Sequence, residues 1–165
     1  MGKIKILAIA SSGGHWIQLL RLLPAFDGQD LVFVSTHKGN QAQAEGHKFY
    51  AVTDATRWEK LKLIKMAFEV RRIISNENPD VIISTGAAPG LMAIIWGWLR
   101  RKKTIWIDSI ANVDRISMSG RIAKPFSRLH LTQWDHLADN KSTFYKGTVI
   151  RSEERRVGKE CRSRW

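Results

Sequence analysis

Short, almost continuous apolar runs alternate along this chain with longer stretches in which apolar residues recur at helical spacing. The apolar runs fall at residues 5–10, 31–35, 49–52, 81–84, 104–107 and 129–133. The helical stretches follow Gly14 as far as Phe26 and then cover 58–76, 89–101 and 119–128. Continuous apolar runs of this length are typical of strands buried on both faces of a parallel sheet.

This rhythm predicts an α/β fold: a single Rossmann-like doubly wound parallel sheet with helices on both faces. Six strands in this arrangement favour the strand order 3-2-1-4-5-6. With 165 residues, the chain has room for one domain and not for two ordinary ones. We assign that domain to residues 1–150.

The last fifteen residues, 151–165, differ from everything before them. Nine of them are charged, no period of 2 or 3.6 is visible, and they hold the only cysteine, Cys161. They are either a solvated basic tail or a non-native segment joined to a shortened gene, and we expect no part of the fold there. A single cysteine also excludes an intrachain disulfide and a multi-cysteine zinc site.

The chain is strongly basic, with 27 Lys and Arg against 15 Asp and Glu, a net charge of +12. This surplus favours a polyanionic partner: nucleic acid, an anionic membrane face or a phosphorylated substrate. The longest apolar run, 87–99, is interrupted by Pro89, Gly90 and Gly97 and falls short of the ~20 residues that span a bilayer. Since the N-terminus carries no secretion signal, we expect a cytoplasmic protein that could still lie on a membrane.

Three loops rich in small or polar residues follow the first, fourth and fifth predicted strands, at 11–15, 85–90 and 108–113. In a doubly wound sheet, ligands bind beyond the carboxyl ends of the strands, where the strand order reverses. The sequence therefore predicts that these three loops meet in one crevice.

The first loop predicts an anion site. Ser12, Gly13 and Gly14 allow a close backbone approach and open a helix whose N-terminal amides favour phosphate. His15 follows directly and is the candidate catalytic residue, as a base or as a phosphate contact. Neither Gly-Lys-Ser/Thr nor G-x-G-x-x-G is present, which argues against an NTPase and a dehydrogenase. A tight turn capped by a serine remains the alternative.

The second and third loops supply further candidates for the same crevice. Gly86 leaves room for a ligand in the loop after the fourth strand. Asp108 follows the fifth strand, at a common position for contacts to substrate hydroxyls, and Ser109 and Asn112 lie just beyond it. On spacing alone, an Asp108 that only caps a turn is equally consistent with the sequence.

The helix after Pro89 combines apolar residues with a basic end. Trp96 and Trp98 precede four consecutive cations, Arg100, Arg101, Lys102 and Lys103. Tryptophans beside a basic cluster are typical of an interfacial membrane contact, and we assign these six residues to one. A sheet-packing helix with a solvated basic end is the alternative.

Together these motifs resemble a family. The segments Ser11–His15 with Gln18, Ser84–Gly90, Ile107–Val113, Ser117–Gly120 and Gln133-Trp134 are similar to those of the acceptor-side subunit of two-part glycosyltransferases. That family includes PssD-type proteins of bacterial capsule and exopolysaccharide synthesis and the membrane subunit of the UDP-GlcNAc transferase of the dolichol pathway. The resemblance covers about residues 4–150. The family often has Glu and Arg where this chain has Asp108 and Asn112.

The resemblance implies a fold equivalent to the N-terminal half of a GT-B glycosyltransferase such as MurG. A small separate subunit would supply the C-terminal half and hold the UDP-sugar. This chain would present a lipid-diphosphate-linked saccharide at the cytoplasmic face of the plasma membrane, as part of an enzyme that is inactive without its partner.

In that role, His15 would act at the reacting centre. The residues expected to contact the acceptor or its phosphates are Ser12, Gly13, Gly14, Gly86, Asp108, Ser109 and Asn112. We expect no cofactor, no metal and no nucleic acid. A basic nucleic-acid-binding module and a stand-alone Rossmann-type enzyme remain the alternative functions.

Overall fold

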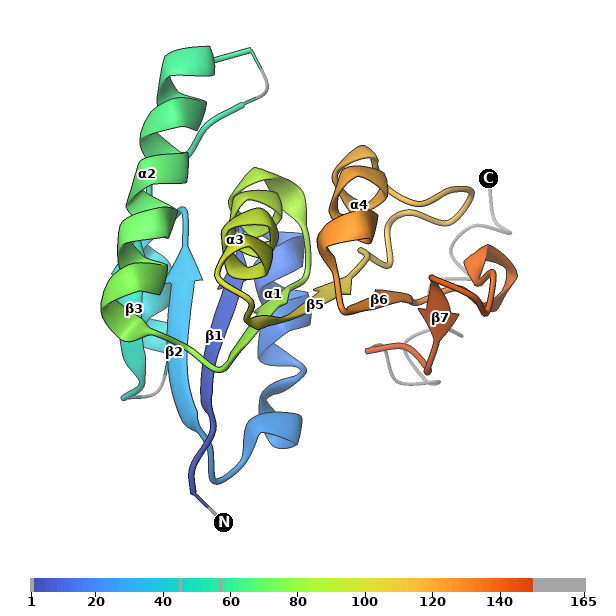
Figure 1. The fold of residues 1–165 in the computed structure, drawn as a ribbon, viewed down its shortest axis with the longest axis horizontal. Helices are drawn as coiled ribbons and strands as arrows, with labels where there is room; N and C mark the ends of the chain where they lie inside the picture. Colours follow the sequence, from blue (N-terminus) through green and yellow to red (C-terminus); the bar gives the residue numbers. More distant parts are fainter. Residues whose placement is uncertain (1, 45, 57, 150–165) are drawn as a thin grey trace, which may run out of the picture.

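The computed structural model describes residues 2–44, 46–56 and 58–149, which form one sheet with helices on both faces (Figure 1). The predicted tail, 151–165, and its Cys161 lie outside the described residues. All strand pairs of the sheet are parallel, so the predicted α/β class is confirmed.

The sheet has seven strands in the order β3-β2-β1-β4-β5-β6-β7. The strands are β1 Lys5–Ala10, β2 Asp30–Ser35, β3 Lys48–Ala51, β4 Val81–Ser84, β5 Lys103–Ile107, β6 Leu129–Thr132 and β7 Phe144–Tyr145. The predicted order 3-2-1-4-5-6 is confirmed. The edge strand β7 was not predicted, because two residues are too few to produce a recognisable pattern.

Helices α2, α3 and α4 lie on one face of the sheet, and α1 lies on the other (Figure 1). Their bounds are α1 Gly14–Leu20, α2 Lys60–Glu77, α3 Ala87–Leu99 and α4 Met118–Ala123. Short 3₁₀ turns at 23–26, 38–43, 124–126 and 135–137 complete the connections.

The side-chain alternation of β1 divides the core between the two faces. Leu7 and Ile9 pack with Met66 and Val70 of α2 and with Ile94 of α3. Ile6, Ala8 and Ala10 point the other way and pack with residues of α1 such as Trp16 and Leu19. Successive strand residues face opposite sides of a sheet, so this apolar run can serve both layers.

Several helix boundaries differ from the prediction. The helix expected as far as Phe26 ends at Leu20, and residues 23–26 form a separate 3₁₀ turn. The helix expected over 119–128 ends at Ala123 and continues only as a 3₁₀ turn, since Pro125 has no N–H to donate to an α-helix. The helix expected from Pro89 begins two residues earlier, at Ala87, which places the proline in the first turn, where its missing donor costs nothing.

A charge cluster around the buried Glu77 ties the end of α2 to the beginnings of two strands. Glu77 is buried and accepts from Tyr50 Oη at 2.5 Å and from Lys48 Nζ at 2.6 Å, with Lys5 Nζ at 3.5 Å. Burial by itself raises the pKa of the Glu77 carboxyl, but the hydrogen bonds from Lys48 and Tyr50 outweigh it and hold the pKa below its ordinary value. The folded protein therefore favours the ionised carboxylate.

Glu77→Gln should lower the free energy of unfolding by about 1–3 kcal/mol at pH 7, because the charged acceptor of these bonds is lost. A carboxylate with a depressed pKa stabilises the fold above its unfolded pKa, about 4.3 for Glu, and loses that contribution as the pH falls through the folded value. Thermal unfolding from pH 7 to pH 3 should therefore show a Tm difference from wild type that narrows in acid. Asp27→Asn, at an exposed carboxylate, is the matched control. A difference that stays constant down to pH 3 contradicts this account.

Candidate functional site

The strand order of this parallel sheet reverses between β1 and β4, and two loops meet there at the carboxyl ends of the strands. His15, in the first turn of α1, and Thr85, after β4, are bonded to each other twice. His15 Nδ1 lies 2.9 Å from the Thr85 carbonyl oxygen, and Thr85 Oγ1 donates to the His15 carbonyl oxygen at 2.7 Å. The switch point of the sheet is thus closed by one pair of residues.

The contact with Thr85 determines the tautomer of the His15 imidazole. A carbonyl oxygen can only accept a hydrogen bond, so Nδ1 must carry the proton that it donates. In the neutral ring, the lone pair is then on Nε2. His15 therefore presents a proton acceptor on the side of the ring away from Thr85.

Gly86 lets the His15 ring lie against the backbone of the second loop. A Cβ atom at Gly86 would lie 2.6 Å from both Cε1 and Nδ1 of His15, and the φ angle of Gly86 is +136°, which disfavours other residues. The space that Gly86 was predicted to leave for a ligand is thus occupied by the His15 ring.

A small pocket of about 190 Å³ lies beside His15. It is lined by His15, Ala87, Ser109, Ala111, Asn112, Ser117, Met118 and Ser119. The structure therefore brings three predicted site residues together: His15, Ser109 and Asn112. Sequence reasoning missed the wall at 117–119, although Ser117 followed by Gly120 carries a cap signal: Ser117 Oγ accepts from Gly120 N at 2.8 Å.

Two residues of the third loop, Asp108 and Ser109, form hydrogen bonds with other residues of the protein. Asp108 is 1% exposed and does not line the pocket, because its carboxylate is turned into the protein. Ser109 Oγ accepts from Gln18 Nε2 at 3.0 Å and from the amide of Ala111 at 3.3 Å. The pocket wall is thus held by buried polar contacts.

The first loop is exposed at the N-terminal end of α1. Gly13 has a φ of +80°, and a Cβ at either Gly13 or Gly14 would meet nothing within 4 Å. Ser12 donates its backbone N–H to Thr36 Oγ1 at 3.1 Å. The space around Gly13 and Gly14 is therefore open, while Ser12 is tied to the residue that follows β2.

Trp96 lies apart from the other residues expected at a membrane, of which Trp98, Arg101 and Lys102 line one hollow. Trp96 packs against α2, with its Nε1 donating to the Ala67 carbonyl oxygen at 3.1 Å and the Arg71 guanidinium over its ring. Trp98 is 50% exposed and contacts Phe126 edge to face. The basic run 100–103 links α3 to the start of β5, at the edge of the sheet opposite His15. Among the described residues, no helix is both long and apolar enough to cross a bilayer.

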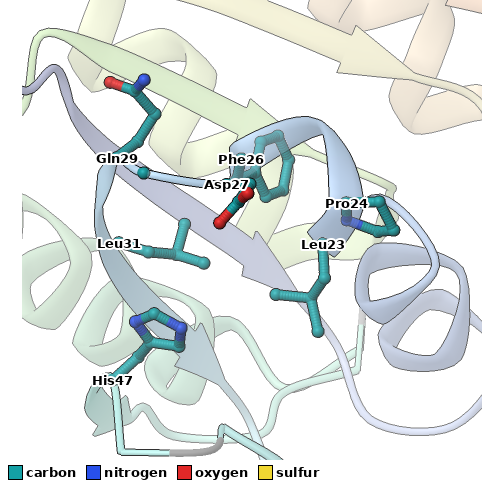
Figure 2. A pocket seen from close by; sticks show the side chains of 8 residues that line it. Leu23, Pro24, Phe26, Asp27, Gln29, Leu31 and His47 are labelled. Atoms are coloured by element: carbon teal, nitrogen blue, oxygen red, sulfur yellow. The ribbon is translucent and has the colours of Figure 1, made fainter.

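A larger hollow, of about 380 Å³, lies beside the connection between α1 and β2 (Figure 2). It is lined by Leu23, Pro24, Phe26, Asp27, Gly28, Gln29, Leu31 and His47. It flanks the beginning of β2, at the edge where the strands start, and none of the predicted site residues contributes to it. The carboxyl-end pocket at His15 is therefore the candidate site.

The architecture is that of the N-terminal half of a GT-B glycosyltransferase. The crystal structure of MurG from Acinetobacter baumannii has a TM-score of 0.74 at 12% identity, over 90% of this chain and 47% of that one. At this identity, the likeness concerns the fold.

Sequence relatives define the family. The UDP-N-acetylglucosamine transferase subunit alg14 of Schizosaccharomyces pombe is 34% identical over 173 residues, covering 87% of this chain and 82% of that protein. The UDP-N-acetylglucosamine–N-acetylmuramyl-(pentapeptide) pyrophosphoryl-undecaprenol N-acetylglucosamine transferase of Geobacillus kaustophilus is 24% identical over 171 residues, 93% of this chain and 47% of that enzyme. This chain thus spans about half the length of the bacterial transferase.

A family model described as "Oligosaccharide biosynthesis protein Alg14 like" matches residues 60–149. The chain belongs to this family and is a component of a glycosyltransferase.

Gly86→Ala should displace the His15 ring, because the new methyl group would overlap it. We expect a loss of about 1–3 kcal/mol in stability from overlap and backbone strain, together with a changed NMR signal of the His15 side chain. Gly28→Ala is the matched control: Gly28 also has a positive φ, +73°, but open space around it. It should cost stability without moving the His15 signal. An unchanged His15 signal in Gly86→Ala would show that the two residues are not in contact.

Proposed function

We propose that this chain is the acceptor-side subunit of a two-part glycosyltransferase. It would present a lipid-diphosphate-linked saccharide at the cytoplasmic face of the membrane for transfer from a UDP-sugar held by a small partner subunit. The setting we propose is bacterial polysaccharide synthesis of the PssD type, in capsule or exopolysaccharide. The observation that carries the proposal is the geometry of His15 in a chain of this family.

In this proposal, His15 is the general base. A hydroxyl of the acceptor sugar attacks the anomeric carbon of the donor, the bond from that carbon to the UDP oxygen breaks, and the hydroxyl proton passes to Nε2. The Thr85 carbonyl oxygen supports this step, because it keeps the Nδ1 proton in place and stabilises the imidazolium that forms.

The neighbouring groups fit a diphosphate and a sugar. Gly13 and Gly14 are exposed, and their backbone amides would donate to phosphate oxygens. Asn112 donates through Nδ2 to Asp108 at 3.1 Å, which leaves its Oδ1 for a sugar hydroxyl.

The size of the pocket supports a site divided between two subunits. Its volume of about 190 Å³ is below the roughly 300–1,000 Å³ of complete ligand sites. In a two-lobed transferase, the second lobe closes over the first and holds the nucleotide-sugar. The partner subunit would thus complete the pocket, and both substrates would be held together only in the assembled enzyme.

The proposal is tested by co-expressing the chain with the glycosyltransferase subunit encoded beside it and measuring transfer from a UDP-sugar to a prenyl-diphosphate-linked sugar. His15→Ala should lower kcat by about 10²–10⁴-fold, the usual cost of losing a general base. Its Tm should change little, since the side chain is only partly buried.

The lone chain and the lone partner are the controls, and each should transfer little or no sugar. Robust transfer by the lone chain would refute the two-part assignment. Activity of His15→Ala within a few-fold of wild type would refute the role of His15.

We place the proposed membrane contact on α2 rather than at the end of α3. Leu61, Ile64 and Phe68 are 83%, 54% and 59% exposed and follow each other at helical spacing. Exposed cations flank them: Lys60, Lys62, Lys65, Arg71 and Arg72. The chain enters α2 from the carboxyl end of β3, so this apolar stripe lies toward the same edge of the sheet as His15, and the first turns of α2 project beyond the sheet (Figure 1). A lipid-linked acceptor needs the membrane at this edge.

Replacing Leu61, Ile64 and Phe68 together by Gln should weaken binding to vesicles containing anionic phospholipid by at least about tenfold, because the apolar insertion is lost. The matched control is Trp98→Gln with Leu99→Gln, two side chains about half exposed at the opposite edge. Circular dichroism verifies that both variants fold. If the control binds vesicles more weakly and the α2 variant binds them like wild type, the membrane contact lies at the end of α3 and not on α2.

A further inference from the structure

We propose that Asp108 is a positioning residue: its buried carboxylate fixes the loop at 109–117, which forms the wall of the His15 pocket, and it does not itself contact the acceptor. This inference rests on the proposed function for the identity of the bound molecule. It replaces the expectation, based on the position of Asp108 after β5, that this carboxylate meets a substrate hydroxyl.

The carboxylate of Asp108 already accepts four hydrogen bonds. Oδ1 accepts from Trp106 Nε1 at 3.1 Å and from Ser117 Oγ at 2.5 Å. Oδ2 accepts from the amide of Ser117 at 2.9 Å and from Asn112 Nδ2 at 3.1 Å. An ionised carboxylate offers about four lone-pair sites, so the donors of the protein occupy all of them.

The surroundings of Asp108 leave little space for movement or for a ligand. The residue is 1% exposed, and a Cβ added to Gly120 of α4 would lie 2.7 Å from Oδ1. Ser117 carries the contact onward, because its Oγ also accepts from the Gly120 amide at the start of α4. One carboxylate thus joins β5, both ends of the pocket loop and the first turn of the next helix.

The opposite side of the loop is held independently. Gln18 Oε1 accepts from the Ile110 amide at 3.1 Å and from Gln133 Nε2 at 2.8 Å. The carbonyl oxygens of Ile110 and Val113 are bound by Trp134 Nε1 at 2.9 Å and by His136 Nε2 at 2.7 Å. The loop is therefore anchored to α1 and to the segment after β6 as well. Asp108 contributes the anchor nearest the pocket wall at Asn112 and Ser117.

The role assigned to Asp108 predicts a specific effect of its loss. Asp108→Asn keeps the size of the side chain but replaces one acceptor oxygen by an NH2 donor. An NH2 group in place of Oδ2 cannot accept from the Ser117 amide or from Asn112 Nδ2. Asn112 and 117–119 would then lose their fixed place opposite His15. Binding of the acceptor should suffer more than the chemistry at Nε2, because His15 is held from the other side by Thr85.

The first measurement is hydrogen exchange of the amides in the full chain. Exchange at Ser117 and Gly120 should be at least about tenfold faster in Asp108→Asn than in wild type, because the acceptor of the Ser117 amide is lost. The matched control is Asp114→Asn, the same change at an exposed carboxylate of the same loop. It should leave exchange unchanged. Ser117→Ala keeps the buried charge and removes only the hydroxyl, so it tests the same contact if Asp108→Asn does not fold.

The second measurement is acceptor kinetics of the pair with its partner subunit, using a prenyl-diphosphate-linked sugar as the probe. For Asp108→Asn and Ser117→Ala we expect a KM for the acceptor raised about tenfold or more with a smaller change in kcat, the mark of lost binding rather than lost chemistry. His15→Ala should show the reverse pattern.

Unchanged exchange at Ser117 and Gly120 in both variants would overturn the proposal. Faster exchange with wild-type acceptor kinetics would overturn it too, because the loop would then be ordered without serving the site. If the wild-type pair transfers no sugar, the proposed function fails instead, and the exchange data alone decide whether Asp108 orders the loop.

Discussion

The site depends on the double hydrogen bond between His15 and Thr85, two residues 70 positions apart in the chain. Each residue lies close beyond a central strand: His15 is in the first turn of α1 after β1, and Thr85 directly follows β4. The bond joins these loops at the point where the sheet order reverses, and it determines which nitrogen of His15 is free. Gly86 is part of the same arrangement, since only a residue without a side chain lets the ring lie there. One contact therefore determines both the position of the His15 imidazole and which of its nitrogens carries the proton in the neutral ring.

The rest of the pocket is built to keep its shape without a ligand. Buried side chains of Gln18, Asp108 and Gln133 hold the facing loop from two sides. Satisfied polar networks of this kind specify a single conformation, whereas a partly satisfied one would be costly. A rigid pocket of this kind would suit the proposed two-part enzyme, because the proposed partner subunit would then meet a preformed surface.

Much of the fold could be predicted because buried parallel strands give continuous apolar runs, and six of the seven strands do. The directions in which helical side chains point were harder to predict. Trp96 and Trp98 were treated as one surface, although residues two positions apart on a helix lie about 200° apart, so one packs on α2 while the other is half exposed. In α2, Leu61, Ile64 and Phe68 fit helical spacing, but the core uses Met66, Val70 and Ile74 instead. The sequence predicted that His15, Ser109 and Asn112 would meet. It could not show that the carboxylate of Asp108 accepts its full number of hydrogen bonds, because its partners lie up to nine residues away in a loop without periodicity.

The central claim is that the Thr85 carbonyl oxygen holds the proton of His15 on Nδ1 and leaves Nε2 as the acceptor. Long-range ¹H–¹⁵N correlation NMR of the imidazole rings, in the folded chain at a pH where the rings are neutral, measures this tautomer directly. With His15→Ala used to assign the signals, the account predicts that His15 carries its proton on Nδ1, with a pyridine-type shift at Nε2. A His15 ring protonated on Nε2, or one that averages both tautomers as free histidine does, would contradict it.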